Sequence, residues 1–214
     1  FLSSRWSAAA GVAAAGLPAP AASDQQFING LTGGTSGVYY PLGVAIGKIY
    51  SDKIPNAKTQ VQATKASVEN LILLQQGRGE IAFALGDSLK AAWNGDEEAG
   101  FKAKLDKLRT IGAIYPNYIQ IVATADSGIK TLADLKGKIL SVVAPQSGTE
   151  LNSLAILAAA GITYKSIRKI ASLPFPESLT LSKNRPLNAT LQSPGLAADA
   201  LRDLLPSPLL PSPS

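Results

Sequence analysis

Histidine, cysteine and methionine are absent from the 214 residues of this sequence. Without histidine or cysteine, the chain cannot form a Ser-His-Asp triad, a thiol nucleophile or a zinc site of the common His/Cys types. The lack of cysteine also excludes disulfides, which fits an exported protein and a cytosolic one equally well. Because methionine is missing even at position 1, we expect the chain not to begin at a native start codon.

Charged residues are scarce, at 16% of the sequence, whereas hydrophobic residues make up 46%, a balance typical of a globular protein. The net charge of +5 comes from basic residues that are scattered along the chain. A nucleic-acid-binding surface needs basic residues clustered on one face, so we expect no nucleic-acid partner. The length allows one large domain or two small ones.

The two ends of the chain differ in composition from the middle. In residues 1–25, Arg5 precedes an Ala-rich run that ends near Ala19-Pro20-Ala21, which predicts a signal peptide; a disordered Ala/Pro linker is the alternative. On the first interpretation the mature protein begins near Ala22 to Gln26 and works in the periplasm. Residues 206–214 repeat Pro-Ser units, which cannot build a core and predict a disordered tail.

Between these ends, strand-like and helix-like stretches alternate. The first predicted elements are strands at 27–34, 57–64 and 81–87 and helices at 37–50 and 66–78. Such a βαβαβ order predicts a parallel sheet with crossover helices. We assign this first α/β lobe to residues 26–114.

A second α/β lobe is predicted at residues 115–205, after two short helices. Residues 109–127 form an apolar stretch interrupted by Pro116, which predicts two strands joined at Tyr115-Pro116-Asn117, where the chain would cross between lobes. The next predicted elements are a helix at 131–137, a strand at 138–145 and a helix at 147–161. The predicted fold class is therefore α/β.

Two loops rich in glycine and hydroxyl residues each connect a predicted strand to a predicted helix. Their residues are Gly34, Thr35, Ser36 and Gly37 in the first lobe and Ser147, Gly148 and Thr149 in the second. Free backbone N–H groups at the positive end of a helix suit an anion. Two such loops facing each other across a cleft would hold one small anionic ligand, although either loop alone could serve only to turn the chain.

Several residues near these loops have two interpretations. Tyr39 and Tyr40 point about 100° apart on a helix, so one could stack on a ligand while the other packs inward. Asp87 follows a predicted strand and could be a helix N-cap or a ligand contact. Asn70 lies in the middle of a predicted helix and could be exposed to solvent. The first loop is neither a P-loop nor a nucleophile elbow, since it lacks the lysine of the former and the glycine spacing of the latter.

Four segments, in order along the chain, resemble the TAXI group of TRAP-transporter solute receptors. They are "LTGGTSGVYYPLGVAIGKIY", "VQATKASVENLILLQQGRGEIAFALGD", "IGAIYPNYIQIVATADSGIKTLADLKGK" and "VVAPQSGTELN". The resemblance covers residues 27 to 205 and is strongest up to Asn152. It implies a two-lobe fold of the type II periplasmic-binding-protein kind, with no cofactor. It also implies a small carboxylate or amino acid, glutamate-like, in the cleft, and delivery of that ligand to the membrane permease subunits of a TRAP transporter.

The resemblance also implies which residues touch the ligand. The implied contacts are Thr35, Ser36, Gly37, Tyr39, Ser67 and Asn70 in the first lobe and Tyr115, Ser147, Gly148 and Thr149 in the second. Asp87 would meet a ligand ammonium group. No catalytic residue is implied.

The sequence departs from the family toward its C-terminus. Family members continue past the second lobe and return to complete the first, whereas this sequence ends in "PSPLLPSPS" and has Asn188 where an acidic residue is usual. We therefore expect an incomplete first lobe that exposes apolar surface, and impaired binding.

Two other function classes remain open. One is an enzyme on the same fold that uses Asp, Glu, Lys or Tyr as acid and base, although no spacing of carboxylates singles out a pair. The other is a ligand-sensing domain that regulates another protein. The export-like N-terminus argues against the second.

Overall fold

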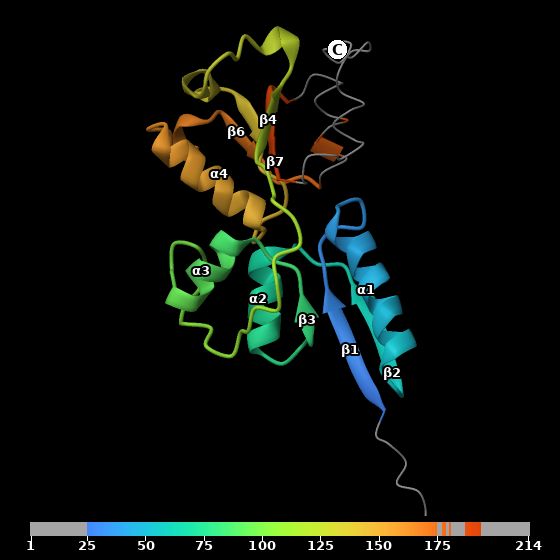
Figure 1. Cartoon of the computed structure of the whole chain (residues 1–214). Helices are drawn as coiled ribbons and strands as arrows, with labels where there is room; N and C mark the ends of the chain where they lie inside the picture. Colours follow the sequence, from blue (N-terminus) through green and yellow to red (C-terminus); the bar gives the residue numbers. More distant parts are fainter. Residues whose placement is uncertain (1–24, 175–176, 179, 181–186, 194–214) are drawn as a thin grey trace, which may run out of the picture.

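The computed structural model describes residues 25–174, 177–178, 180 and 187–193, which form two α/β lobes, one above the other (Figure 1). The predicted signal peptide, apart from residue 25, and the predicted Pro/Ser tail lie outside the described residues. No helix in the described part of the chain combines the length and apolar character needed to cross a bilayer.

The first lobe is built on a parallel sheet in the order β2-β1-β3. Its strands are β1 (Gln26–Leu31), β2 (Ala57–Gln62) and β3 (Ile81–Ala82). The connecting helices are α1 (Tyr39–Lys53) and α2 (Ser67–Gln75). The predicted βαβαβ order is thus confirmed, but the third strand is far shorter than the sequence indicates, since only two of its residues pair with β1.

Helix α1 approaches its sheet closely because glycines face the strands. A Cβ atom at Gly43 would lie 2.5 Å from Cγ2 of Thr32, and one at Gly47 would lie 3.4 Å from Oγ1 of Thr59. A larger residue at Gly43 would push the helix off the sheet, so the glycine permits this packing distance.

The other helices of the first lobe share a separate apolar cluster. Val68 and Leu71 of α2 pack with Ala92 of α3 (Gly86–Asn94) and with Phe101 and Leu108 of the segment that follows. Burial of these side chains is the main stabilising contribution in this half of the lobe. The cluster holds α2 and α3 side by side below the second lobe (Figure 1).

The second lobe contains a mixed sheet in the order β4-β7-β5-β6. Its strands are β4 (Gln120–Ala123), β5 (Ile139–Ser141), β6 (Lys169–Ala171) and β7 (Ala189–Gln192). β7 runs antiparallel to β4 and parallel to β5. Helix α4 (Gly148–Ala159) covers the sheet, and its Leu157 packs with Leu140 and Ile162 in the core. Short 3-10 turns lie at Ala125–Ser127, Leu132–Leu135 and Tyr164–Ser166.

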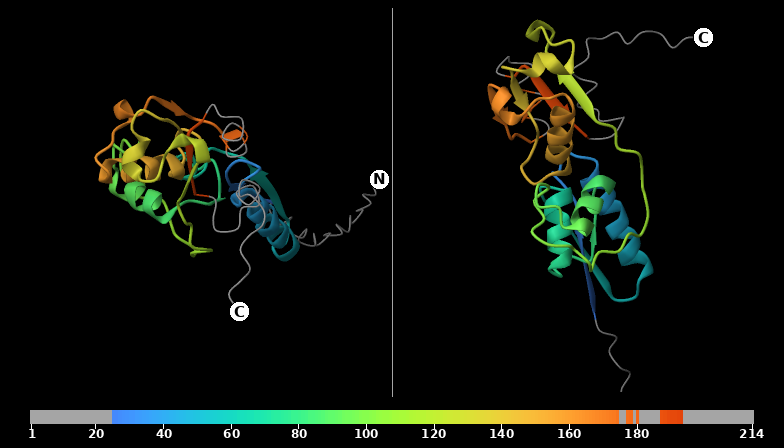
Figure 2. Two further views of the ribbon diagram at one scale, coloured as in Figure 1. Left: turned by 90° about the horizontal axis from the view of Figure 1, so that it is seen from above. Right: turned by 90° about the vertical axis from the view of Figure 1, so that its left-hand side faces the viewer.

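The connection between the lobes differs from the sequence prediction. The sequence predicts two strands across residues 109–127, and only the second forms, as β4; residues 109–119 form no strand and run along the side of the molecule (Figure 2). The segment has strand-like composition but finds no described partner strand, and Ile111 is 80% exposed. Of the two short helices predicted before this segment, α3 forms, and turns follow it at residues 96–108. The short helix predicted at 131–137 is a single 3-10 turn, Leu132–Leu135.

Asn188 links the two inner strands of the second sheet, β5 and β7, where their pairing begins. Its side-chain oxygen accepts a hydrogen bond from the backbone N–H of Ile139 at 2.8 Å, and its own N–H donates to the Ile139 carbonyl at 2.9 Å. An aspartate oxygen could accept the first of these bonds equally well. Asparagine at this position therefore preserves the start of the β5–β7 pairing.

Candidate functional site

A cavity of about 330 Å³ lies between the two lobes, and we call it the interlobe cavity. Among the predicted binding residues, those that line it are Gly34, Ser36, Gly37, Tyr39, Ser67, Tyr115, Ser147, Gly148 and Thr149. Both glycine-hydroxyl loops thus contribute to one shared space. Thr35, Asn70 and Asp87 do not line it.

The lobes touch each other where helices α2 and α4 begin. The N–H of Glu69 in α2 donates to the carbonyl of Gln146 at 3.4 Å. A Cβ atom at Gly148 would lie 2.6 Å from Cδ1 of Leu85 and 2.7 Å from Oγ of Ser67, both of which belong to the first lobe. A larger residue at position 148 would require Leu85 and Ser67, or the lobes themselves, to shift, so the glycine allows this contact.

The two helix starts bring backbone donors to the interlobe cavity. The first N–H groups of a helix have no partner within the helix, and they carry the positive end of its dipole. In α4, the Ser147 hydroxyl accepts from the N–H of Glu150 at 3.1 Å and so caps one of these donors. In α2, no side chain caps the start. Several N–H groups therefore remain for an anion.

The loops before both helices hold an unusual backbone conformation. Ala66, directly before α2, has φ 73°, and Val143, after β5, has φ 65°. A positive φ is uncommon for alanine and is a true outlier for a β-branched valine. Both residues line the interlobe cavity. Strain of this kind concentrates at ligand sites, where the surrounding structure maintains it.

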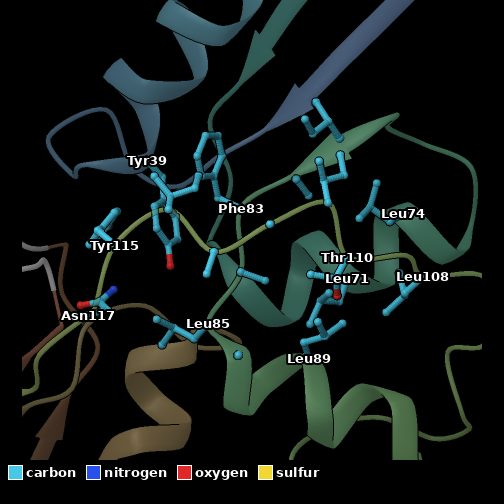
Figure 3. Close-up of a pocket in the computed structure, with 18 of the residues that line it drawn as sticks. Tyr39, Leu71, Leu74, Phe83, Leu85, Leu89, Leu108, Thr110, Tyr115 and Asn117 are labelled. Carbon is cyan, nitrogen blue, oxygen red and sulfur yellow. The ribbon is translucent and has the colours of Figure 1, made fainter.

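Tyr39 forms an aromatic wall of the interlobe cavity. Its ring stacks on Phe83 at 5.2 Å between centroids and is tilted toward Tyr115 at 6.4 Å (Figure 3). Burial raises the pKa of the Tyr39 phenol to about 12, and Tyr115 adds to the rise, while hydrogen bonds with the side chains of Asn117 and Ser67 oppose it. The phenol is therefore protonated at neutral pH and can act as a neutral hydrogen-bond donor.

Asn117 lies beside Tyr39 and also lines the interlobe cavity, although the sequence did not single it out. Its amide nitrogen faces the Tyr39 hydroxyl and its oxygen points away (Figure 3). That oxygen, Oδ1, is buried and has no hydrogen-bond partner among the described residues. Because this oxygen is buried, a group in the cavity does not reach it, and Asn117 contributes to the site through its contact with Tyr39.

Asn70 is fully buried, at 0% exposure, so the interpretation that it faces solvent is wrong. Its Nδ2 donates to the carbonyls of Thr32 at 2.6 Å and Phe83 at 2.8 Å. Its Oδ1 accepts from the Thr64 hydroxyl at 2.6 Å. Asn70 thus ties the ends of β1 and β3 to α2 and supports the loops above it without facing the interlobe cavity.

Asp87 lines a second cavity, of about 670 Å³, whose wall is mostly first-lobe residues but includes Asn152 of α4. This cavity adjoins the interlobe cavity, because Tyr39, Leu85, Tyr115 and Asn117 line both. Its Oδ1 accepts from the N–H of Ser88 at 2.6 Å, at the start of α3. The N-cap interpretation of Asp87 is wrong, because the N-cap of α3 is Leu85 and Asp87 lies in the first turn of the helix. Thr35 is exposed at the tip of a turn, closed by the Gly37 N–H on the Gly34 carbonyl at 2.9 Å.

Several further residues of the interlobe cavity were not predicted. They follow the carboxyl ends of strands: Thr64, Lys65 and Ala66 after β2, Val143 and Ala144 after β5, and Gln192 and Ser193 at the end of β7. Ligands of α/β proteins commonly bind at this edge of a sheet, so the strand ends could have indicated the first five. Among the described residues, no group of three or more Asp, Glu, His or Cys side chains is placed to hold a metal ion.

Comparisons with known proteins agree with this architecture. The model of the NMT1-like family matches residues 31–208. The structure is similar to the alkanesulfonate-binding protein SsuA from Xanthomonas axonopodis pv. citri bound to MOPS, with 17% identity, a TM-score of 0.53 and coverage of 80% of this chain and 56% of that one. It is also similar to a binding protein component of an ABC phosphonate transporter from Pseudomonas aeruginosa, with 13% identity, a TM-score of 0.55 and coverage of 85% and 60%.

A third similar structure is the arginine-bound form of a truncated ArgBP from T. maritima, with 12% identity, a TM-score of 0.53 and coverage of 83% of this chain and 77% of that one. At these identities the likeness concerns the fold, and the predicted two-lobe α/β class is confirmed. The chain spans little more than half the length of the Xanthomonas protein.

Proposed function

We propose that this chain, which belongs to the NMT1-like family, is an extracytoplasmic solute receptor that encloses a small anionic molecule between its lobes. The observation that carries the proposal is the interlobe cavity, whose walls come from both lobes and where the starts of α2 and α4 meet. Backbone donors at two helix starts can hold one anion from both sides. Binding then favours the arrangement in which the lobes are in contact.

The energetics of such a site are sufficient for a transport receptor. A hydrogen bond to a charged group contributes about 1.5–3 kcal/mol. Four or five of them, after the cost of ordering the ligand, support a dissociation constant of about 1 μM, equivalent to about −8 kcal/mol. No chemical step is needed, because enclosure alone performs the function.

The TAXI resemblance favours a small carboxylate or an amino acid, glutamate-like, as the ligand and the permease subunits of a TRAP transporter as the partner. The Pseudomonas neighbour belongs to an ABC transporter, which makes an ABC permease the alternative partner. Uptake into vesicles that contain the receptor and a candidate permease distinguishes them. A TRAP partner requires an ion gradient, whereas an ABC partner requires ATP.

Titration calorimetry of the purified chain against small carboxylates and amino acids tests the receptor function. We expect at least one compound to bind with a dissociation constant of about 1 μM, or a weaker one to the extent that the predicted impairment of binding applies, and to raise the melting temperature. No binding of any small anion up to millimolar concentration would contradict the proposal. Recovery of the ligand chemically unchanged after incubation separates a receptor from an enzyme.

A matched pair of lysine variants locates the site. Lys65 lines the interlobe cavity, whereas Lys58 is exposed on β2 and does not line it. We expect Lys65→Gln to weaken anion binding about fivefold, since it removes a partly solvated charge, and Lys58→Gln to leave it unchanged. Equal effects of the two variants would place the ligand elsewhere.

A further inference from the structure

The side chains that line the interlobe cavity are unbalanced in charge. Among the described lining residues, Lys65 is the one charged side chain, and there is no aspartate or glutamate. The other polar groups are neutral, chiefly hydroxyls such as those of Ser67 and Thr149 and the amides of Asn117 and Gln192. The cavity therefore has positive and neutral donors but no negative group.

The nearest acids are turned away from this cavity and are already engaged. Oε2 of Glu69 accepts from the N–H of Lys65 at 2.6 Å, and Oε2 of Glu150 accepts from the N–H of Gln146 at 2.8 Å. Each glutamate thus closes the loop that precedes its own helix. Neither of them lines the interlobe cavity.

Asp87 is the remaining acid close to the site. It lies near enough to Tyr39 to contribute to the raised pKa of that phenol, but it lines the adjoining cavity and not the interlobe cavity. Its Oδ1 accepts from the Ser88 N–H at 2.6 Å. Asp87 is therefore not a direct contact for a ligand held in the interlobe cavity.

An enclosed ammonium group needs several acceptors and a negative partner. It carries three N–H donors, and burying it without an anionic partner is strongly unfavourable. The wall offers such a group only neutral acceptors, the hydroxyl and amide oxygens, and no carboxylate. Neutral acceptors match a hydroxyl donor, but they cannot balance an ammonium charge.

We infer that the interlobe cavity selects small oxyanions that carry no ammonium group, with a neutral hydroxyl at most, and discriminates against amino acids and other zwitterions. This inference rests on the proposed receptor function and narrows its ligand class. The helix starts and Lys65 hold the oxyanion, and the hydroxyl and amide side chains of the wall pair with a neutral donor. The ammonium contact expected of Asp87 has no place in this arrangement.

Ligand pairs that differ only in the replacement of an ammonium by a hydroxyl test the inference on the full chain. Suitable pairs are lactate and alanine, 2-hydroxyglutarate and glutamate, and isethionate and taurine, each titrated calorimetrically. We expect the hydroxy member to bind at least about tenfold more tightly in every pair that binds. An amino member that binds as tightly as its hydroxy partner would overturn the inference while leaving the receptor function intact. No binding in any pair would overturn both.

A variant that places a carboxylate in the cavity gives a second test. Ser147→Asp keeps a good N-cap on α4 but adds a negative charge to the cavity wall. We expect the preference for the hydroxy member to fall at least about tenfold, because the anion is repelled and an ammonium gains a partner. The control is Thr163→Asp, which adds the same charge at an exposed helix start of the same lobe. An unchanged preference in folded Ser147→Asp protein would contradict the inference.

Discussion

The two glycine-hydroxyl loops are alike in sequence, but the structure uses them differently. At Gly148 in the second lobe, an added Cβ would collide with Leu85 and Ser67 of the first lobe at 2.6 and 2.7 Å. At Gly34 in the first lobe, an added Cβ would meet nothing within 4 Å. The second loop is thus a close contact between lobes, whereas the first is an open rim of the interlobe cavity.

The structural counterpart of the second loop is the turn before α2, not the first glycine loop. In both places a glutamate in the first helical turn accepts a hydrogen bond from a backbone N–H just before the helix, Lys65 for Glu69 and Gln146 for Glu150. A residue with positive φ, Ala66 or Gln146, accompanies each turn. A shared geometry can therefore arise without a shared glycine pattern.

The largest effect that we predict is the loss of stability when Asn70, which holds the first-lobe loops in place by hydrogen bonds, is truncated. Asn70→Ala removes hydrogen bonds to the buried carbonyls of Thr32 and Phe83 and should lower the free energy of unfolding by about 3 kcal/mol. Asn152→Ala, in the second turn of α4, should cost less than about 1 kcal/mol. Urea denaturation measures both. Equal losses of unfolding free energy in the two variants would mean that the Asn70 hydrogen bonds give the first-lobe loops no special stabilisation.

The next prediction tests whether the lobes must touch at Gly148. Gly148→Val should weaken ligand binding about a hundredfold, since the added side chain forces the start of α4 away from Leu85 and opens the interlobe cavity. Small-angle scattering should show a larger radius of gyration for this variant. Calorimetry with the best-binding oxyanion measures the affinity.

Gly34→Val is the matched control for that variant. Open space surrounds the Cβ position at Gly34, so we expect a change in affinity of less than about threefold. If both valines weakened binding equally, the distinction between a contact loop and a rim loop would fail. If neither did, the contact at Gly148 would have no role in binding.

A smaller difference is expected between the two threonines of the loops. The Thr149 hydroxyl is hydrogen-bonded to that of Ser193, and both residues line the interlobe cavity, whereas Thr35 is exposed and does not line it. Thr149→Ala should weaken binding about tenfold, and Thr35→Ala should have no effect. Thr149→Ser, which keeps the hydroxyl, should restore most of the affinity. A tenfold loss in Thr35→Ala would instead place the ligand at the outer turn.

The sequence was informative wherever a local pattern dictates structure. The alternation of apolar runs with helical periods predicted the βαβαβ order along the chain and the parallel pairing of the first sheet, and the position of glycines and hydroxyls before helices led to Ser147 and Gly148. These features depend on residues close together in the chain. They could therefore be predicted without knowledge of the tertiary contacts.

Features that depend on distant partners could not be predicted in this way. Residues 109–119 have strand composition but no described strand beside them, so composition alone misleads there. Asn117 and Gln192 reach the interlobe cavity only because the chain crosses between lobes and returns through β7. The burial of Asn70 likewise depends on carbonyls more than a dozen residues away.

The smallest effect that we predict is the effect of pH on ligand affinity through the tyrosines on the first-lobe side of the interlobe cavity. The second loop has no phenol, whereas α1 begins with Tyr39, whose pKa burial raises to about 12, and burial also raises that of Tyr115. Both phenols are protonated from pH 6 to 9. The ratio of the wild-type affinity to the Tyr39→Phe affinity should therefore change by less than about twofold over that range.

Stability should respond to Tyr39 only in alkali. The folded state holds the phenolic proton more tightly than the unfolded state, whose pKa is about 10, so the stability linked to this proton is fully present below pH 10. It is lost as the pH rises from about 10 to about 12, where the wild-type chain must ionise a buried group in order to stay folded. Urea denaturation across this range should therefore show a steeper decline for the wild type than for Tyr39→Phe. Parallel declines would mean that the Tyr39 ring is open to water, and the aromatic wall of the cavity would then have to be placed elsewhere.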